Sequence, residues 1–494
     1  MYMSNMILLP VVFPIMLGFL LLLVTERVFS NRKILIYMTG VSFILCALLS
    51  CLAISGAAGE RLVLFRLPDN IFVCLAMDGL GRLFAGLVTL IFVLVGFYSL
   101  SYMRHERNEK RFYGFYLITF GVLMGLCFAG NMVTLYMFYE LMTLATVPLV
   151  LHEGTKEAVM AGLKYLFYSF GGAYMALFGI YVLYRFAGAS DFKAGGFLDA
   201  SQSGDTGLLL VSAFLMILGF GVKAGCFPLH AWLPTAHPAA PAPESAFLSG
   251  IIVKGGVLAI VRTVFYCFGA ETLRGTWVQT AWAVLAIITV LMGSSLAFKE
   301  KVLKKRLAYS TVSNLSYILL GLSMMNTTAF VGSMLHVVFH AVIKSALFMF
   351  AGALIFNTGR TRVNDYIGLA GRMPVLFGCY TIVSLGLIGI PPMSGLVSKW
   401  YLAAGCLESG ISVISWLGAA ALLLSALLTA AYLLPVSVKG FLYAPVDSSL
   451  IEQYREPGPL MLVPIMILAA ITILIGIYPV WLIDFIRGVG AALM

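Results

Sequence analysis

Long apolar runs alternate with short polar segments along the whole chain. About 20 consecutive apolar residues cross a bilayer as a helix, and this pattern predicts fourteen such helices. We expect them near residues 7–25, 34–55, 79–102, 112–129, 131–151, 159–187, 207–231, 240–268, 277–298, 303–325, 328–357, 374–406, 411–438 and 459–485. The predicted fold is therefore an all-α polytopic membrane protein, and we expect the first run to remain a helix rather than act as a signal peptide.

Composition agrees with this pattern and limits the classes of protein and cofactor that the chain can represent. The chain has 494 residues, of which 61% are hydrophobic and 11% are charged, a balance that excludes a soluble domain of this size. Its eight cysteines show no CxxC or metal-type spacing, so we interpret them as packing residues. The sequence contains no haem, iron–sulfur or nucleotide motif, and we expect no cofactor.

Positive charge in the loops predicts an orientation. The net charge of +10 could indicate an anionic partner, but most Lys and Arg fall in loops that follow odd-numbered predicted helices. Positively charged loops usually stay in the cytoplasm. We therefore interpret the excess positive charge as a consequence of membrane orientation, and we expect no nucleic-acid partner. Because the number of predicted helices is even, both termini then lie on the outer side.

The stretch from residue 219 to 254 carries unusual polar chemistry for a membrane segment. It reads GFGVKAGCFPLHAWLPTAHPAAPAPESAFLSGIIVK and contains Lys223, Lys254, two histidines and five prolines, the first of them Pro228. A lysine at bilayer depth costs roughly 3 kcal/mol, and proline frees backbone carbonyls that lipid cannot satisfy. We predict a broken helix beside a wet cavity, followed by a helix that returns a second lysine to the same depth.

Further charges fall within predicted membrane helices. Glu140 lies about ten residues into its span, close to the bilayer middle. Exposing it to lipid together with five buried lysines would cost on the order of 18 kcal/mol, more than a typical domain's stability. These six residues must face inward, and we predict that Glu140 and Lys223 form a switchable pair: they pair in one state, and in another Lys223 turns toward the central axis and gives up its proton. For any one of the six, the alternative is a structural ion pair or an interfacial side chain. They are Glu140, Lys164, Lys223, Lys254, Lys344 and Lys399.

The eleventh predicted helix contains HVVFHAVIKSALF. His336, His340 and Lys344 are spaced i, i+4, i+8, which stacks them on one helix face about 6 Å apart. Because imidazoles exchange protons near neutral pH, the spacing predicts a proton relay. The alternatives are core histidines and a metal site, although no carboxylate or cysteine lies beside them in the sequence.

Two predicted helices are interrupted at comparable places. Pro391 and Pro392 break the twelfth helix ahead of Lys399, as Pro228 breaks the seventh beside Lys223. Paired interruptions five helices apart are typical of inverted repeats in transporters. We predict N-terminal helices at 1–110, repeats at 111–268 and 277–438, and a C-terminal helix at 459–494.

Several motifs carry a resemblance to a known family. They are DGLGRLF, the span that contains Glu140, KAGCFPLHAWLPTAHPAAPAPESAFLSGIIVK, LKKRLAYSTVSNLSYILLGL, HVVFHAVIK and GIPPMSGLVSKW. With them the chain resembles the antiporter-like subunits shared by respiratory complex I (its N, M and L subunits), Mrp-type cation/proton antiporters and membrane-bound hydrogenases. With lysine at position 399, the chain is similar to the D-type subunits of Mrp antiporters and the L-type subunits of complex I. In the stretch FYELMTLATVPLVLHEGTKEA, it is similar to the subunits of group 4 hydrogenase and formate hydrogenlyase-type complexes. Glu244 stands where this family has a small apolar residue.

The resemblance implies fourteen helices, two inverted five-helix halves and a central hydrophilic axis. It assigns ion translocation to Glu140, Lys223, Lys254, His336, His340, Lys344 and Lys399, and the buried position of Lys164 adds that residue. The expected function is proton or sodium translocation within a multisubunit redox-driven or antiporter complex of a prokaryotic cell (inner) membrane. Electron chemistry would belong to partner subunits. Two alternatives stay open: an autonomous secondary cation/proton antiporter, and a membrane scaffold whose buried charges specify packing.

Overall fold

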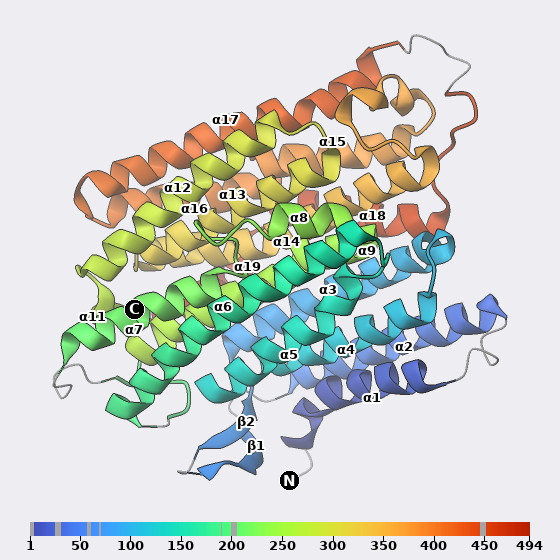
Figure 1. Cartoon of the computed structure of the whole chain (residues 1–494). Helices are drawn as coiled ribbons and strands as arrows, with labels where there is room; N and C mark the ends of the chain where they lie inside the picture. The colour runs from blue at the N-terminus through green and yellow to red at the C-terminus, as the bar shows by residue number, and fades with distance from the viewer. Residues whose placement is uncertain are drawn as a thin grey trace.

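The computed structural model describes residues 4–24, 31–56, 61–68, 71–188, 190–198, 205–444 and 451–494. Helices dominate it and lie side by side in one bundle (Figure 1). The α-helices are α1 (Leu9–Leu23), α2 (Arg32–Ser55), α3 (Gly79–Tyr102), α4 (Glu109–Cys127), α5 (Met132–Val150), α6 (Lys156–Ala187), α7 (Thr206–Gly221), α8 (Leu233–Ala239), α9 (Ala242–Phe247), α10 (Val253–Val261), α11 (Ala270–Leu273), α12 (Trp277–Lys299), α13 (Leu303–Ser323), α14 (Thr327–Thr358), α15 (Pro374–Ile388), α16 (Ser394–Glu408), α17 (Ser412–Leu442), α18 (Pro459–Ile477) and α19 (Val480–Ala491).

Short 3-10 and π segments complete the helical structure. The π-helices η5 (Leu248–Ile252) and η6 (Arg262–Phe268) flank α10, so one helical crossing runs from Ala242 to Phe268. Single π turns inside α-helices frequently occur at functional sites. The 3-10 segments are η1 (Ser4–Ile7), η3 (Met103–His105), η7 (Val363–Tyr366) and η8 (Leu369–Gly371).

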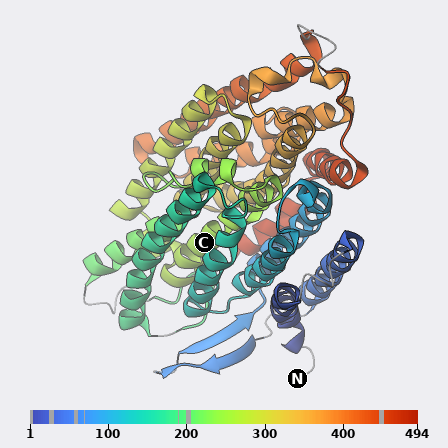
Figure 2. The same ribbon diagram turned by 45° about the vertical axis from the view of Figure 1, so that its right-hand side comes forward.

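The chain is a multi-pass membrane protein. Within the described residues, nine helical segments are long and apolar enough to cross a membrane, and α1, α7 and α15 are shorter apolar helices. The crossing Ala242–Phe268 is fully enclosed and α14 is nearly so, which makes these two the centre of the bundle. Helices α1, α2 and α18 lie at its periphery (Figures 1 and 2).

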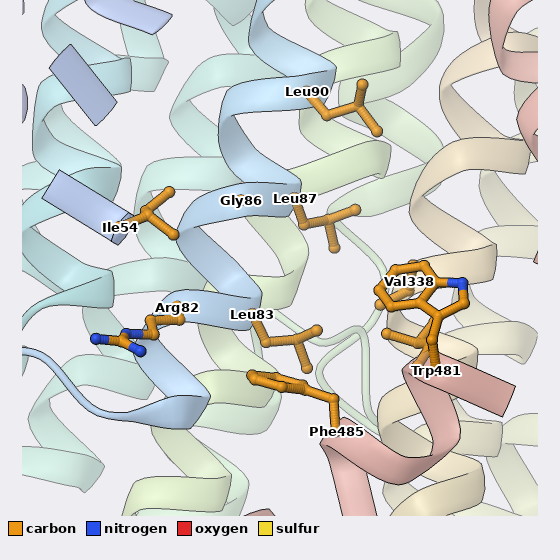
Figure 3. Close-up of a pocket in the computed structure, with 10 residues that line it drawn as sticks. Ile54, Arg82, Leu83, Gly86, Leu87, Leu90, Val338, Trp481 and Phe485 are labelled. Carbon is orange, nitrogen blue, oxygen red and sulfur yellow. The ribbon is translucent and has the colours of Figure 1, made fainter. Parts of the chain in front are cut away.

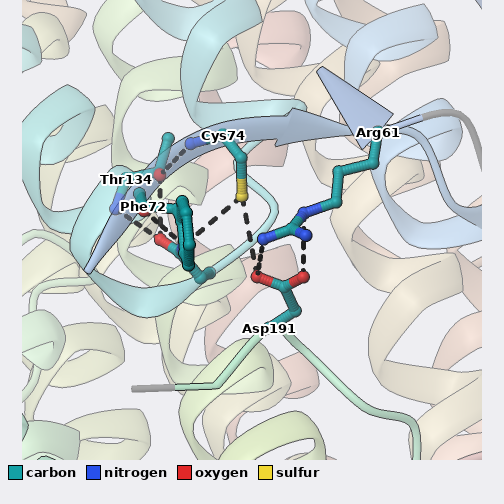
Figure 4. Close-up of polar contacts among 6 residues, drawn as sticks. Arg61, Phe72, Cys74, Thr134 and Asp191 are labelled. Atoms are coloured by element: carbon teal, nitrogen blue, oxygen red, sulfur yellow. Dashed lines mark hydrogen bonds and ion pairs between the residues drawn. The ribbon is translucent and has the colours of Figure 1, made fainter. Parts of the chain in front are cut away.

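A β-hairpin departs from the all-helical prediction. Strands β1 (Arg61–Arg66) and β2 (Phe72–Ala76) pair antiparallel in a segment expected to be a loop. The hairpin is fixed to neighbouring segments, because the Cys74 backbone N–H donates to Thr134 Oγ1 at 2.9 Å and Arg61 pairs with Asp191 at 2.9 Å (Figure 4). The fold is therefore mostly helical with one small sheet at one end of the bundle.

Two of the predicted helices are interrupted. Helix α7 ends at Gly221 and α8 begins at Leu233, with turns between them that contain Pro228. Helix α15 ends at Ile388 and α16 begins at Ser394, with Pro391 and Pro392 in the gap. The predicted helix 459–485 also divides, since α18 ends at Ile477 and α19 begins after Pro479, where a proline lacks the N–H that would continue the helix.

Candidate functional site

Lys223 lies in the turn that follows α7, enclosed by tyrosines. Its side chain is fully buried, and its ammonium donates a hydrogen bond to the Tyr165 hydroxyl. The same ammonium is 4.2 Å from the ring centroid of Tyr165 and 5.9 Å from that of Tyr139. The Tyr165 hydroxyl is also 2.8 Å from Thr146 Oγ1. Aromatic faces and hydroxyls thus replace water around this charge.

Glu140 and Lys164 lie at the rim of this cluster and are half-buried. Glu140 Oε1 has no hydrogen-bond partner among the described residues, and Glu140 makes no direct ion pair with Lys223. The Lys223 ammonium faces tyrosines instead. Lys164 Nζ donates to Thr235 Oγ1 in α8 at 3.0 Å. In this structure Glu140 and Lys223 are therefore not in direct contact, and Lys164 lies against α8.

Lys254 stands at the centre of the bundle, directly after the π-helix η5. Its ammonium donates to the Ser249 carbonyl, which belongs to η5, and lies 2.8 Å from His340 Nδ1. Both side chains are almost completely buried. A Cβ added at Gly256, two residues further on, would come within 2.6 Å of the Phe220 carbonyl and 2.8 Å of Lys223 Cβ. The Lys254 helix thus packs tightly against the α7 turn on one side and contacts α14 on the other.

The polar groups of α14 branch toward two neighbouring helices. The rings of His336 and His340 stack with centroids 5.9 Å apart. His336 Nδ1 is 2.9 Å from Ser398 Oγ in α16, whereas Lys344 Nζ donates to Ser310 Oγ of α13 at 2.7 Å. The two histidines therefore point along the path from Lys254 toward α16, and Lys344 forms a separate arm toward α13.

Lys399 lies in α16 beside the second interruption. Its ammonium donates to the carbonyls of Leu387 and Ile388 at 2.7 and 2.8 Å, two carbonyls freed where α15 ends. The carbonyl end of a helix carries partial negative charge, which stabilises a cation there. The same ammonium is 5.4 Å from the ring of Tyr317, and Tyr317 stacks on His336 at 5.3 Å. Tyr317 and Ser398 thus join Lys399 to the histidines.

Some side chains that contact the buried charged groups could not be predicted from the sequence. Tyr165, Tyr317 and Ser398 contact the charged groups from other helices, and their only signal in the sequence is a hydroxyl within an apolar run. An ion pair between the buried Arg262 and the partly exposed Asp78 was also missed; its two hydrogen bonds measure 2.5 and 2.8 Å. Among the described residues, no cluster of three or more His, Cys, Asp or Glu side chains could hold a metal ion.

A separate apolar pocket lies away from this polar path. It has a volume of about 340 Å³ and opens between α3 and α19, where Leu83, Leu87, Trp481 and Phe485 line it (Figure 3). Arg82 lies at its edge and donates a hydrogen bond to the Gly56 carbonyl. The pocket's lining includes none of the buried lysines or histidines described above.

Comparison with known proteins identifies the family. The chain belongs to the NADH:quinone oxidoreductase/Mrp antiporter transmembrane family, whose model matches residues 129–429. The model of the complex I chain 5 N-terminus matches residues 70–113. These matches confirm the resemblance drawn from the motifs.

Individual relatives agree with this assignment. The chain is 32% identical to the N subunit of NADH-quinone oxidoreductase from Desulforudis audaxviator, over 85% of this chain and 82% of that protein. It is 29% identical to the D-type subunit of a Na(+)/H(+) antiporter from Bacillus subtilis, over 98% and 96% respectively. Its fold matches a chain of the Mrp complex from Dietzia sp. DQ12-45-1b with a TM-score of 0.85 and 21% identity, covering 100% of this chain and 98% of that one.

Proposed function

We propose that this chain is a proton- or sodium-translocating, antiporter-like membrane subunit of a multisubunit complex. The observation that carries the proposal is the buried contact between Lys254 and His340, which joins polar groups on both sides of the bundle centre. The relatives support it, since they are named as subunits of a quinone oxidoreductase and of a Na(+)/H(+) antiporter. The Mrp complex, which shares the fold, is a multisubunit membrane assembly.

The proposed path runs laterally through the bundle. Glu140 and Lys164 form one end, Lys223 follows them, and Lys254 connects that half to His340. The path then passes His336 and ends at Lys399, while Lys344 extends it toward α13. Where side chains do not touch, a bridging water supplies the missing hydrogen bond.

The helices support a count of fourteen crossings, ten of which form two inverted halves of five. We count α7 with α8, the segment Ala242–Phe268, and α15 with α16 as one crossing each. The repeats would then occupy 111–268 and 277–438, after helices within 1–110 and before a last crossing within 459–494. Each half contains one interrupted crossing with a lysine beside the gap, which is the arrangement found at binding sites of repeat-built transporters.

The proposed setting is a prokaryotic cell (inner) membrane, with both termini on the outer side and other membrane subunits as partners. The exposed faces of α5 and α6 are apolar beside half-buried Glu140 and Lys164, with Leu144 52% and Phe167 77% exposed. Such a face suits lipid or a neighbouring subunit. The path would then continue into a partner at this edge.

Reconstitution of the intact complex tests the proposal. Proteoliposomes containing it should take up protons or sodium ions on adding the complex's electron donor or an opposing ion gradient. Glu140→Gln and Lys223→Ala should abolish uptake at equal complex amounts, with Glu157→Gln on exposed α6 as the matched control. Ion uptake by the isolated chain alone would favour an autonomous antiporter. Unchanged uptake in both variants would favour a scaffold.

A further inference from the structure

The apolar pocket between α3 and α19 follows one face of α3. Leu83, Gly86, Leu87 and Leu90 form its floor, and their spacing places them on the same side of the helix over about 10 Å. A Cβ added at Gly86 would meet no atom within 4 Å, so the floor is open above this residue. The pocket is therefore an apolar space that extends for about two helical turns along α3.

Helix α19 forms the wall of the pocket that faces α3. Trp481 and Phe485 line the pocket from this helix (Figure 3). A Cβ added at Gly79 would come within 2.8 Å of Val489 Cγ2, so α19 lies against the first turn of α3. Trp481 is 62% exposed. Tryptophan is enriched where a membrane protein meets lipid headgroups, which indicates that the start of α3 lies at headgroup level.

Arg82 is the one charged residue among the described residues that line the pocket. It lies in the first turn of α3, so its charge is at the headgroup end of the apolar floor. Its guanidinium donates to the Gly56 carbonyl, but its Nε has no hydrogen-bond partner and it forms no ion pair with a described carboxylate. Because a guanidinium has five N–H donors, several of them remain for an anion.

We propose that this pocket binds one phospholipid, with an acyl chain along residues 83–90 of α3 and the phosphate hydrogen-bonded to Arg82. The order of groups along α3, a cation followed by an apolar floor, matches the order from headgroup to chain in a phospholipid. A guanidinium suits a phosphate because its N–H groups match the phosphate oxygens. The inference goes beyond the proposed function, since a lipid site requires no ion movement.

The pocket also reaches the helix that carries the two stacked histidines. Val338 of α14 lines it and lies between His336 and His340 in the sequence. Two residues turn an α-helix by about 200°, so Val338 faces away from the side on which the histidines stack. A bound acyl chain would therefore contact the back of this helix and would not enter the polar path.

Photolabelling of the intact complex in phosphatidylethanolamine vesicles tests the inference. The probe is a phosphatidylglycerol with a diazirine in one acyl chain, and mass spectrometry locates the labelled peptides, which should lie in α3 and α19. Gly86→Leu fills the open floor and should reduce this labelling roughly tenfold for every two methylenes that the leucine displaces. Gly171→Leu is the matched control, because a Cβ on this exposed residue of α6 likewise meets no atom within 4 Å; it should label as the wild type does.

Two further measurements test recognition of the phosphate. Arg82→Gln should reduce labelling about fivefold, whereas Arg82→Lys, which keeps the charge, should retain most of it. Unlabelled phosphatidylglycerol should displace the probe from the wild-type complex, and a diacylglycerol, which lacks the phosphate, should not. This competition needs no variant, so it stays decisive if Arg82→Gln does not assemble.

Several results would overturn the inference. Equal labelling of the wild type and an assembled Gly86→Leu variant would show that no chain occupies the pocket. Displacement by diacylglycerol as readily as by phosphatidylglycerol would show that the phosphate is not recognised. Displacement by a short-chain quinone would identify a quinone site instead, and cross-links from α3 to a neighbouring subunit in place of lipid labels would identify a protein partner.

Discussion

The clearest test of a lateral path is to interrupt it at Lys254. This residue contacts the first half through its helix, which packs against the Lys223 turn, and the second half through His340 at 2.8 Å. Lys254→Met keeps a side chain of similar length but removes the group that binds a proton. We expect transfer to slow strongly there, because the methionine leaves no room for a water in its place.

The size of the effect follows from the surroundings of each residue. Moving a positive charge past an apolar side chain at this depth costs roughly 3 kcal/mol, which slows transfer on the order of a hundredfold. His336→Ala instead opens space for a water between His340 and Ser398. An immobilised water costs at most about 2 kcal/mol, equivalent to roughly a 30-fold loss. Lys254→Met should therefore be the more severe variant.

Proton uptake into vesicles, measured with a pH-sensitive dye at matched complex amounts, compares the two variants. Lys254→Arg provides a second comparison, because arginine keeps the charge and the hydrogen bonds but does not release its proton. It should be as defective as Lys254→Met if proton exchange at this position matters. A smaller loss in Lys254→Met than in His336→Ala would show that the two halves do not connect in series through Lys254.

Three further expectations can be checked separately. Glu140→Gln should reduce ion-coupled turnover severely while native gels show normal assembly; wild-type turnover would remove Glu140 from the path. Burial and neighbouring Arg111 lower the pKa of His152 to about 4 from 6.5. As the pH falls, the unfolded chain therefore takes up the proton before the folded chain does. The free energy of unfolding should drop by about 3 kcal/mol between pH 6.5 and 4. Thermal unfolding in detergent should show this drop in the wild type and not in His152→Gln; equal pH profiles would contradict it. Asp78→Asn removes the charge that pairs with the buried Arg262; because the Asp78 side chain is itself 36% exposed, water replaces part of the lost interaction, and the cost should be about 2 kcal/mol in the same assay. A cost below about 0.5 kcal/mol would show that water or lipid compensates the charge fully.

Hydropathy predicts the helices well because membrane helices depend on a local property, the length of an apolar run. It fails where short elements interrupt the pattern. The hairpin strand β1 reads RLVLFR, with charges at both ends, and so resembles a polar loop. The division between α18 and α19 depends on Pro479, which lies within an otherwise unbroken apolar run.

The contacts within the candidate site were likewise predictable only in part. The stacking of His336 on His340 depends on spacing within one helix, which the sequence contains. The hydrogen bonds of Lys223 to Tyr165 and of Lys344 to Ser310 depend on how separate helices pack, and no spacing along the chain encodes that. Packing also determines what surrounds Lys223 in this structure, where tyrosines from neighbouring helices, and not Glu140, lie against the ammonium.

The distribution of charge along the proposed path suits proton movement. Lys254 Nζ and His340 Nδ1 are 2.8 Å apart, so a single proton lies between them and the two groups cannot both be fully protonated. In the second half, Lys399 is stabilised by backbone carbonyls rather than by a carboxylate, so its charge is only partly balanced. Two lysines that approach the histidines from opposite ends repel each other's charge in this low-dielectric interior. The histidines between them must then stay neutral, and a neutral imidazole both accepts and donates a proton. A path with fewer protons than binding groups has vacancies into which a proton can move, which is the condition for translocation.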